Sequence, residues 1–239
     1  MINVLVWNEY RHEQLEESVR KIYPEGIHKA IGAFLQEDDV NVYYGTLEME
    51  ECGLSQEAVD KADVIMWWGH MAHGEVPDEL VERVHQAVLK GTGLIVLHSG
   101  HESKLFKKVM GTPCDLHWRD GDRERVWCIN PTHPIADGIP EYFELEHEEM
   151  YGEPFGIPNP DDIIFMGWFA GGEVFRSGCT FTRGWGKVFY FQPGHEGHEN
   201  FYNEYIQKII KNAVRWAAPL RKRETLDCVH AKNKPEKEN

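Results

Sequence analysis

The chain has 239 residues, of which 40 are acidic and 25 are Lys or Arg, so its formal net charge is −15 with neutral histidine. This length suits one large domain that buries a full core without disulfides or metal ions as staples. A surface of this sign repels phosphate groups, which argues against nucleic acids and anionic membranes as partners. The five scattered cysteines include no C-x-x-C pair, so neither a disulfide framework nor a thiolate zinc site is indicated.

The start of the chain resembles neither a signal peptide nor a membrane span. Its apolar run covers residues 2–7 and is followed by polar residues. A span needs a run of about 20 residues. We therefore expect a cytoplasmic protein.

The first 110 residues alternate between predicted strands and predicted helices. Buried-strand patterns fall at residues 2–7, 40–44, 63–68 and 93–97, and helical patterns at 27–35, 77–89 and 102–110, with a further short helix capped by Ser55. Residues 8–25 are polar and are expected to form a long loop. The alternation predicts right-handed crossovers and a flavodoxin-like, doubly wound, mostly parallel sheet with helices on both faces.

Residues 111–185 interrupt this rhythm. Short strand candidates lie at residues 126–129, 142–145, 163–166 and 179–182, among Gly and Pro turns. We interpret them as extra, partly antiparallel strands of the same domain. A last buried strand at residues 186–191 and a closing helix at 200–216 complete a single domain over residues 1–219. Residues 220–239 form a charged tail whose end is expected to be disordered.

Thirteen histidines are the unusual feature of the composition. His70, His98 and His195 each follow a predicted buried strand. Because parallel strands end at the same edge of a sheet, where ligands bind in such folds, the three imidazoles are expected to converge. Residues 146–151 add carboxylates, Glu149 among them. Imidazole with carboxylate suits zinc or a related divalent ion, or acid–base chemistry near neutral pH.

Each histidine taken alone has a simpler interpretation. A His-x-x-His spacing arises by chance in a histidine-rich chain, so His101 and His198 can be surface residues. The aromatic side chains leave a similar choice. Trp67 is expected in the core, whereas Trp68, beside Gly69, could equally stack on a sugar face. Trp118 and Tyr151 are further candidates for stacking.

The segment after the fourth predicted strand lies where hydrolases of similar fold have their nucleophile elbow. Ser99 does not complete G-x-S-x-G, since position 97 is Leu. If the centre of the pattern is laid on His98, Gly100 takes its proper place, and His98 should face the crevice. Histidine is a poor acyl-transfer nucleophile, so a metal or proton-transfer role is favoured. Residues 195–198 also lack one spacer of H-E-x-x-H, so no zincin is indicated.

Five segments, residues 63–73, 93–99, 133–135, 149–151 and 186–195, make the chain resemble the ThuA-like, trehalose-utilisation family, whose fold is that of class I glutamine amidotransferases. The resemblance covers roughly residues 1–217. It implies a site at the elbow after the fourth strand and an association with the catabolism of disaccharides and their keto derivatives. Glutamine amidotransferases have cysteine at the elbow, where this chain has His98. Cysteine-dependent glutamine hydrolysis is therefore not expected.

Together these patterns favour an enzyme that acts on a sugar or ketosugar with a divalent metal ion, zinc being the first choice. The assigned residues are His70, His98 and His195 for the metal, Glu149, His73 and Tyr151 for catalysis, and Trp68 and Ser99 for substrate binding. Two alternatives stay open: a non-catalytic carbohydrate-binding or regulatory protein, and a cysteine-independent amidase that uses Ser99. The expected partner is a small sugar, and a homo-oligomer is compatible with the sequence.

Overall fold

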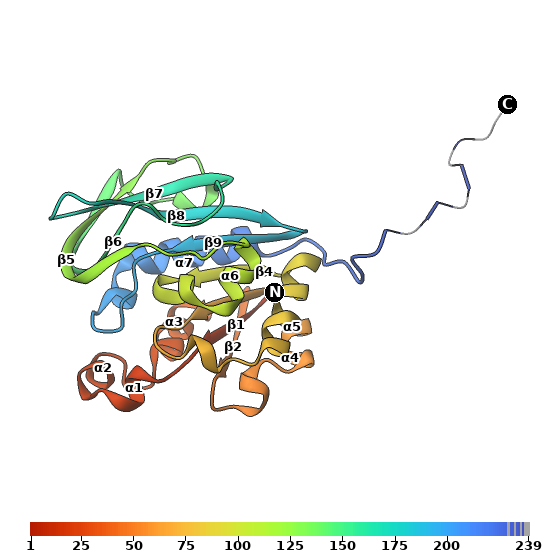
Figure 1. Ribbon diagram of the computed structural model, residues 1–239, viewed down its shortest axis with the longest axis horizontal. Helices are drawn as coiled ribbons and strands as arrows, with labels where there is room; N and C mark the ends of the chain where they lie inside the picture. Colours follow the sequence, from red (N-terminus) through yellow and green to blue (C-terminus); the bar gives the residue numbers. More distant parts are fainter. Residues whose placement is uncertain (229, 232, 235, 237–239) are drawn as a thin grey trace.

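The structure is a computed structural model that describes residues 1–228, 230–231, 233–234 and 236 (Figure 1). The predicted disorder at the end of the tail falls in part on residues outside this set. Among the described residues, no helix combines the length and the apolar character that crossing a membrane requires.

A single nine-stranded sheet forms the centre of the molecule, in the order β2-β1-β3-β4-β9-β8-β7-β5-β6. The strands are β1 (Ile2–Asn8), β2 (Val40–Thr46), β3 (Val64–Trp68), β4 (Gly93–Leu97), β5 (His117–Cys128), β6 (Tyr142–Gly152), β7 (Asp162–Phe169), β8 (Val174–Arg183) and β9 (Gly186–Phe191). The first five strands of the sheet order pair in parallel, and the remaining pairs are antiparallel. The predicted flavodoxin-like α/β fold is confirmed.

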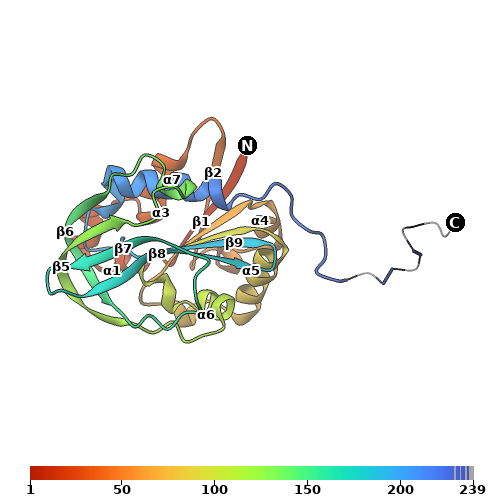
Figure 2. The same ribbon diagram turned by 90° about the horizontal axis from the view of Figure 1, so that it is seen from above.

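Helices cover both faces of the parallel half (Figure 2). They are α1 (His12–Leu15), α2 (Glu17–Ile22), α3 (Ile27–Leu35), α4 (Gln56–Lys61), α5 (Asp78–Lys90), α6 (Lys104–Met110) and α7 (Glu204–Ala217). Helices α3 and α7 pack on one face, and α4, α5 and α6 on the other. Because successive strand side chains point to opposite faces, Ile65 belongs to one core and Met66 to the other. Burial on both faces explains the continuous apolar runs.

Two expectations about the elements were wrong. Residues 8–25 are not one loop, because they contain α1 and α2. These helices are short and mostly polar, and Val19 is the one hydrophobic side chain that α2 buries, so no apolar periodicity marks them. The four extra strands run for 8 to 12 residues instead of four. Their additional residues are largely polar and exposed, and only the buried part of each strand carries an apolar signal.

The antiparallel half curls so that β6, the last strand of the sheet order, returns to the carboxyl ends of the parallel strands. Gly194, which follows β9, donates its backbone N–H to Glu148 at 2.8 Å. The Gln192 side chain donates to the Glu149 carbonyl at 3.3 Å. These contacts bring Glu148 and Glu149 of β6 beside the turn that follows β4. The candidate site lies where β6 meets the carboxyl ends of the parallel strands.

Candidate functional site

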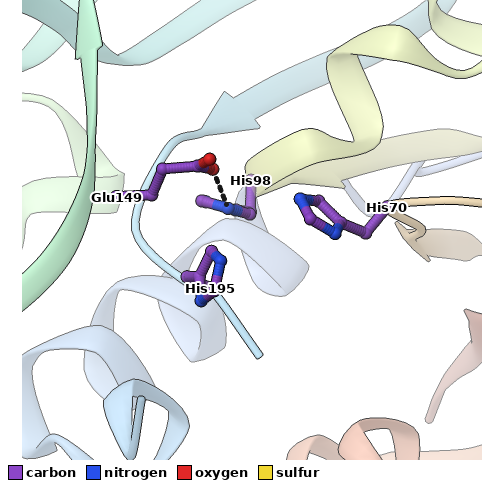
Figure 3. A group of neighbouring side chains, drawn as sticks. All are labelled: His70, His98, Glu149 and His195. Carbon is purple, nitrogen blue, oxygen red and sulfur yellow. Dashed lines mark ion pairs between the residues drawn. The ribbon is translucent and has the colours of Figure 1, made fainter. Parts of the chain in front are cut away.

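Three neighbouring strands deliver the three predicted imidazoles. His70 follows β3, His98 directly follows β4 and His195 follows β9, and these strands pair in the order β3-β4-β9. One ligand atom from each histidine and one from Glu149 all lie within 4.8 Å of one another. Figure 3 shows the carboxylate and the rings of His70 and His195 gathered around His98. The strand adjacency that the convergence required is present.

The backbone at His98 has the strained form of an elbow. His98 adopts a positive φ of 49°, in the left-handed region that non-glycine residues avoid. Gly100 stands where a Cβ atom would come within 2.8 Å of Val96 Cγ1, so the tight turn requires a residue without a side chain. The elbow is thus retained, with histidine at its centre.

The imidazole of His98 is fully buried instead of facing the crevice, which corrects the expected exposure. Its Nδ1 lies 2.8 Å from the carbonyl oxygen of Gln192, an acceptor only, so Nδ1 carries the proton. Its Nε2 lies 3.0 Å from Glu149 Oε2 and 3.3 Å from the Tyr151 hydroxyl. Within the described residues Glu149 Oε2 has no aligned hydrogen bond. Two electron-rich atoms this close are stabilised by a cation, either a proton or a metal ion.

Electrostatics give the rings of His98 and His195 different protonation states. Burial by itself lowers the pKa of His98, but the contact with Glu149 and the charges of the nearby glutamates outweigh it and raise the pKa to about 9. Burial, assisted by the charge of His98, lowers the pKa of His195 to about 4, so this ring is neutral near pH 7. Burial also opposes ionisation of Glu149, yet its contact with His98 lowers the pKa of this carboxyl below its usual value.

His70 is oriented by a carboxylate that sequence reasoning missed. Glu196 Oε1 lies 3.2 Å from His70 Nδ1 and 3.2 Å from His12 Nε2. A carboxylate at one ring nitrogen fixes the tautomer and leaves the other nitrogen free for a metal ion, the usual arrangement behind a metal-bound histidine. His12, His70 and Glu196 also form a second group with ligand spacing. His12 was hidden in the segment interpreted as a loop.

His195 is held differently from the other two imidazoles. Its Nδ1 accepts the backbone N–H of Gly197 at 2.9 Å, so in the neutral ring the proton sits on Nε2. Its own backbone N–H points to Glu148 Oε1 at 3.3 Å. A metal ion bound to Nε2 would replace that proton. His195 can therefore serve either as a metal ligand or as a proton donor.

A cavity of about 480 Å³ opens beside these groups, a size typical of small-molecule sites. His70, His195, Glu149 and Tyr151 line it, together with Ser99. The Ser99 hydroxyl donates to the Gly69 carbonyl at 2.7 Å, so its lone pairs remain available to a ligand.

Three predicted site residues, His98, Trp68 and His73, do not line this cavity, and His98 is fully buried. Trp68 is fully buried in the α3/α7 core and donates its indole N–H to the Gly194 carbonyl at 3.0 Å, so it is no platform for a sugar. His73 packs against Gly69, and burial lowers the pKa of its ring to about 4. Within the described residues its Nε2 has no hydrogen-bond partner.

His101 is not a surface residue, because it is 4% exposed and its Nδ1 lies 2.9 Å from the Cys114 carbonyl. Glu148 was also missed. It is fully buried and accepts from the Gly194 backbone and the Asn200 side chain. The sequence carried no signal for Glu148, because Glu144, Glu146 and His147 stand in the same strand and are exposed.

Both the sequence and the fold are similar to those of known proteins. The family model described as "ThuA: Trehalose utilisation" matches residues 3–217. Among solved structures, a ThuA-like protein from Bacteroides uniformis ATCC 8492 has 15% identity and a TM-score of 0.64, with 90% of each chain covered. A cytoplasmic protein from Salmonella typhimurium LT2 has 13% identity and a TM-score of 0.62, with 91% of this chain and 100% of that chain covered.

PurLQS from Thermotoga maritima has 11% identity and a TM-score of 0.55, covering 90% of this chain and 99% of that chain. At these identities the structures speak for the fold, which is the flavodoxin-like, glutamine amidotransferase type. No curated protein matches the sequence. The family model spans nearly the whole domain, from β1 to α7, and this chain belongs to the ThuA, trehalose-utilisation family.

Proposed function

We propose that this chain is a metal-dependent enzyme that breaks down a disaccharide or a ketosugar. The observation that carries the proposal is the convergence of three imidazoles and one carboxylate beside a cavity of ligand size. Histidine and carboxylate are ligand types that catalytic zinc takes, and three protein ligands leave the fourth position to water or substrate. We propose His70, His98 and His195 as the residues that would hold the ion, with Glu149 beside them as the base.

The residues of the chain have separable parts in such a site. When bound, a divalent ion polarises a carbonyl group or lowers the pKa of a water molecule. Glu149, ionised and at the cavity wall, is placed to take a proton from a substrate hydroxyl or from water. The Tyr151 hydroxyl and the Ser99 lone pairs are placed to orient sugar hydroxyls.

Metal analysis of protein purified without a histidine tag tests this proposal. We expect close to one zinc or related ion per chain, and loss of that ion in His70→Ala and in His98→Ala. His98 has a fully buried ring, so His98→Ala also lowers stability, whereas the His70 side chain is 25% exposed and its replacement leaves less of a void. His117→Ala, at an exposed histidine, is the control. Metal-free wild-type protein would contradict the proposal.

One observation favours a second candidate, a carbohydrate-binding or regulatory protein without catalysis. The elbow geometry is retained while its central residue is histidine, and among the described residues no cysteine lines the cavity. Sugar binding that is unaffected by a chelator, with no turnover of the bound sugar, would favour this candidate.

We also propose a cytoplasmic location, in line with the description of the Salmonella relative.

A further inference from the structure

The mouth of the cavity carries an exposed indole that the proposed metal centre does not use. Trp118 is 64% exposed and lines the cavity together with Asp115 and Asp120. A tryptophan is normally buried at least in part, because transfer of its large ring out of water is favourable. An exposed indole at the rim of a ligand-sized cavity is therefore a candidate contact for the ligand.

Strand register places this indole on the wall of the site. Trp118 of β5 and Tyr151 of β6 are directly paired in an antiparallel ladder. Directly opposite residues of such a pair point to the same face of the sheet. The Tyr151 ring stacks on His98, with ring centroids 5.0 Å apart and an interplanar angle of 19°. Trp118 thus stands on the same wall as Tyr151, further from His98.

Apart from its histidines, the titratable side chains toward the mouth of the cavity are acidic. Glu102, Asp115, Asp120 and Glu149 line it, and no Lys or Arg of the described chain does. Lys107, outside the lining, pairs with Glu102 at 2.5 Å and offsets its charge. In the described part of the chain, the side chains of Asp115 and Asp120 take part in no hydrogen bond or ion pair. Ionised carboxylates accept hydrogen bonds from hydroxyl groups and repel anions.

We propose that Trp118, Asp115 and Asp120 form an outer subsite for a neutral, unphosphorylated sugar ring. The indole stacks on the C–H face of the ring, the two carboxylates accept hydrogen bonds from its hydroxyl groups, and their charge rejects sugar phosphates and sugar acids. This inference rests on the proposed function, since it takes the cavity as the place of carbohydrate chemistry. It adds the charge class of the substrate and the residues that select it.

Calorimetric titration with two matched pairs of sugars tests the subsite: glucose with glucose 6-phosphate, and trehalose with trehalose 6-phosphate. We expect at least one neutral sugar to bind more tightly than its phosphate ester. Trp118→Ala should weaken that binding roughly three- to tenfold, the effect of losing one ring-stacking contact. Trp185→Ala is the control, because Trp185 is 61% exposed but lies outside the cavity, where Arg223 covers its ring.

A second variant tests the charge. Asp120→Asn should narrow the preference for the neutral sugar over its ester by roughly two- to fivefold, the effect of one exposed charge. Asp161→Asn, at an exposed carboxylate outside the cavity lining, should leave the preference unchanged.

Three results would overturn the subsite: equal or tighter binding of the phosphate esters, equal losses in Trp118→Ala and Trp185→Ala, or no binding of either neutral sugar. Metal content measured on the same samples separates this inference from the proposed function. Metal-free protein that still binds a neutral sugar through Trp118 would contradict the metal-dependent enzyme and leave the subsite intact.

Discussion

At the scale of single residues, the hydrogen bond to one nitrogen of a histidine decides what the other nitrogen can bind. Glu196 takes this role for His70, with Oε1 at 3.2 Å from Nδ1. Burial opposes the charge of Glu196, but the hydrogen bond with His70 and the nearby histidines outweigh it and hold the pKa of this carboxyl well below its usual range. Glu196 is therefore a positioning residue that acts through His70.

Replacing this carboxylate should weaken metal binding without removing a ligand. We expect Glu196→Gln to lower the affinity for zinc by about 10- to 100-fold, because an amide is a weaker acceptor and loosens the orientation of His70. Competition with a chromophoric chelator measures the change. Glu199→Gln, at an exposed glutamate three residues later, should bind zinc as wild type does. Equal affinities for the two variants would show that Glu196 does not orient a metal ligand.

The cysteines allow a separate prediction about chemistry. Burial raises the pKa of Cys114 to about 11 and that of Cys179 to about 12, so neither thiol is a ready nucleophile. Treatment with iodoacetamide under native conditions should modify mainly the exposed Cys228 and leave metal and sugar binding unchanged. Stoichiometric loss of either property when one thiol is modified would contradict a cysteine-independent site.

At the scale of elements, the turn after β9 depends on one buried carboxylate of β6. Glu148 accepts the backbone N–H of Gly194 at 2.8 Å and the side-chain amide of Asn200 at 2.6 Å. His195 also directs its N–H to the same carboxylate. The position of one proposed metal ligand is therefore set by a strand that lies far away in the sheet order.

Glu148→Gln should lower the free energy of unfolding by about 2–3 kcal/mol, because an amide cannot accept all of these donors and leaves a buried group unsatisfied. Urea denaturation followed by circular dichroism measures the loss. Glu146→Gln, two residues earlier and exposed, changes the same functional group and should leave stability within about 0.5 kcal/mol of wild type. A similar stability for both variants would mean that Glu148 does not anchor the turn.

The elements also show where sequence reasoning reached its limit. His70, His98 and His195 could be predicted because each comes shortly after an apolar run, and parallel strands end at one edge. The contacts of Glu148 and Glu196 could not, because they depend on the curl of the antiparallel strands and on the turn after β9. Trp68 was misassigned because a strand end and its neighbouring glycine do not show on which face the indole is buried.

At the scale of the whole molecule, the parallel half was predictable and the antiparallel half only in outline. Strands covered by helices on both faces carry continuous apolar runs, which identify them within a single sequence. Strands such as β5 leave one face in water, so polar residues fill most of their length. The polar helices α1 and α2 are equally hard to predict, and the position of His12 of α1 beside His70 emerges only when the chain is folded.

The limit of the domain gives a last prediction at this scale. The sequence suggested a boundary at residue 219, yet Lys222 donates to the carbonyl groups of Asp60 at 2.5 Å and Ala62 at 3.0 Å. The backbone N–H of Arg223 donates to the Lys90 carbonyl at 2.8 Å. These bonds lie at the amino-terminal end of the sheet, away from the histidines that follow the carboxyl ends of β3 and β4.

A chain truncated after residue 219 should therefore lose about 1–2 kcal/mol of unfolding free energy, since the lost hydrogen bonds are only partly buried. Truncation after residue 227 keeps the same bonds and should leave stability unchanged. Both truncated chains should retain the metal content of the full chain, because the candidate metal ligands stand at the opposite end of the strands. Thermal and urea unfolding of the three chains measure the first effect, and metal analysis the second. Equal stabilities of the full chain and the chain truncated after residue 219 would mean that the domain ends at 219. Loss of metal in either truncated chain would mean that the tail supports the site.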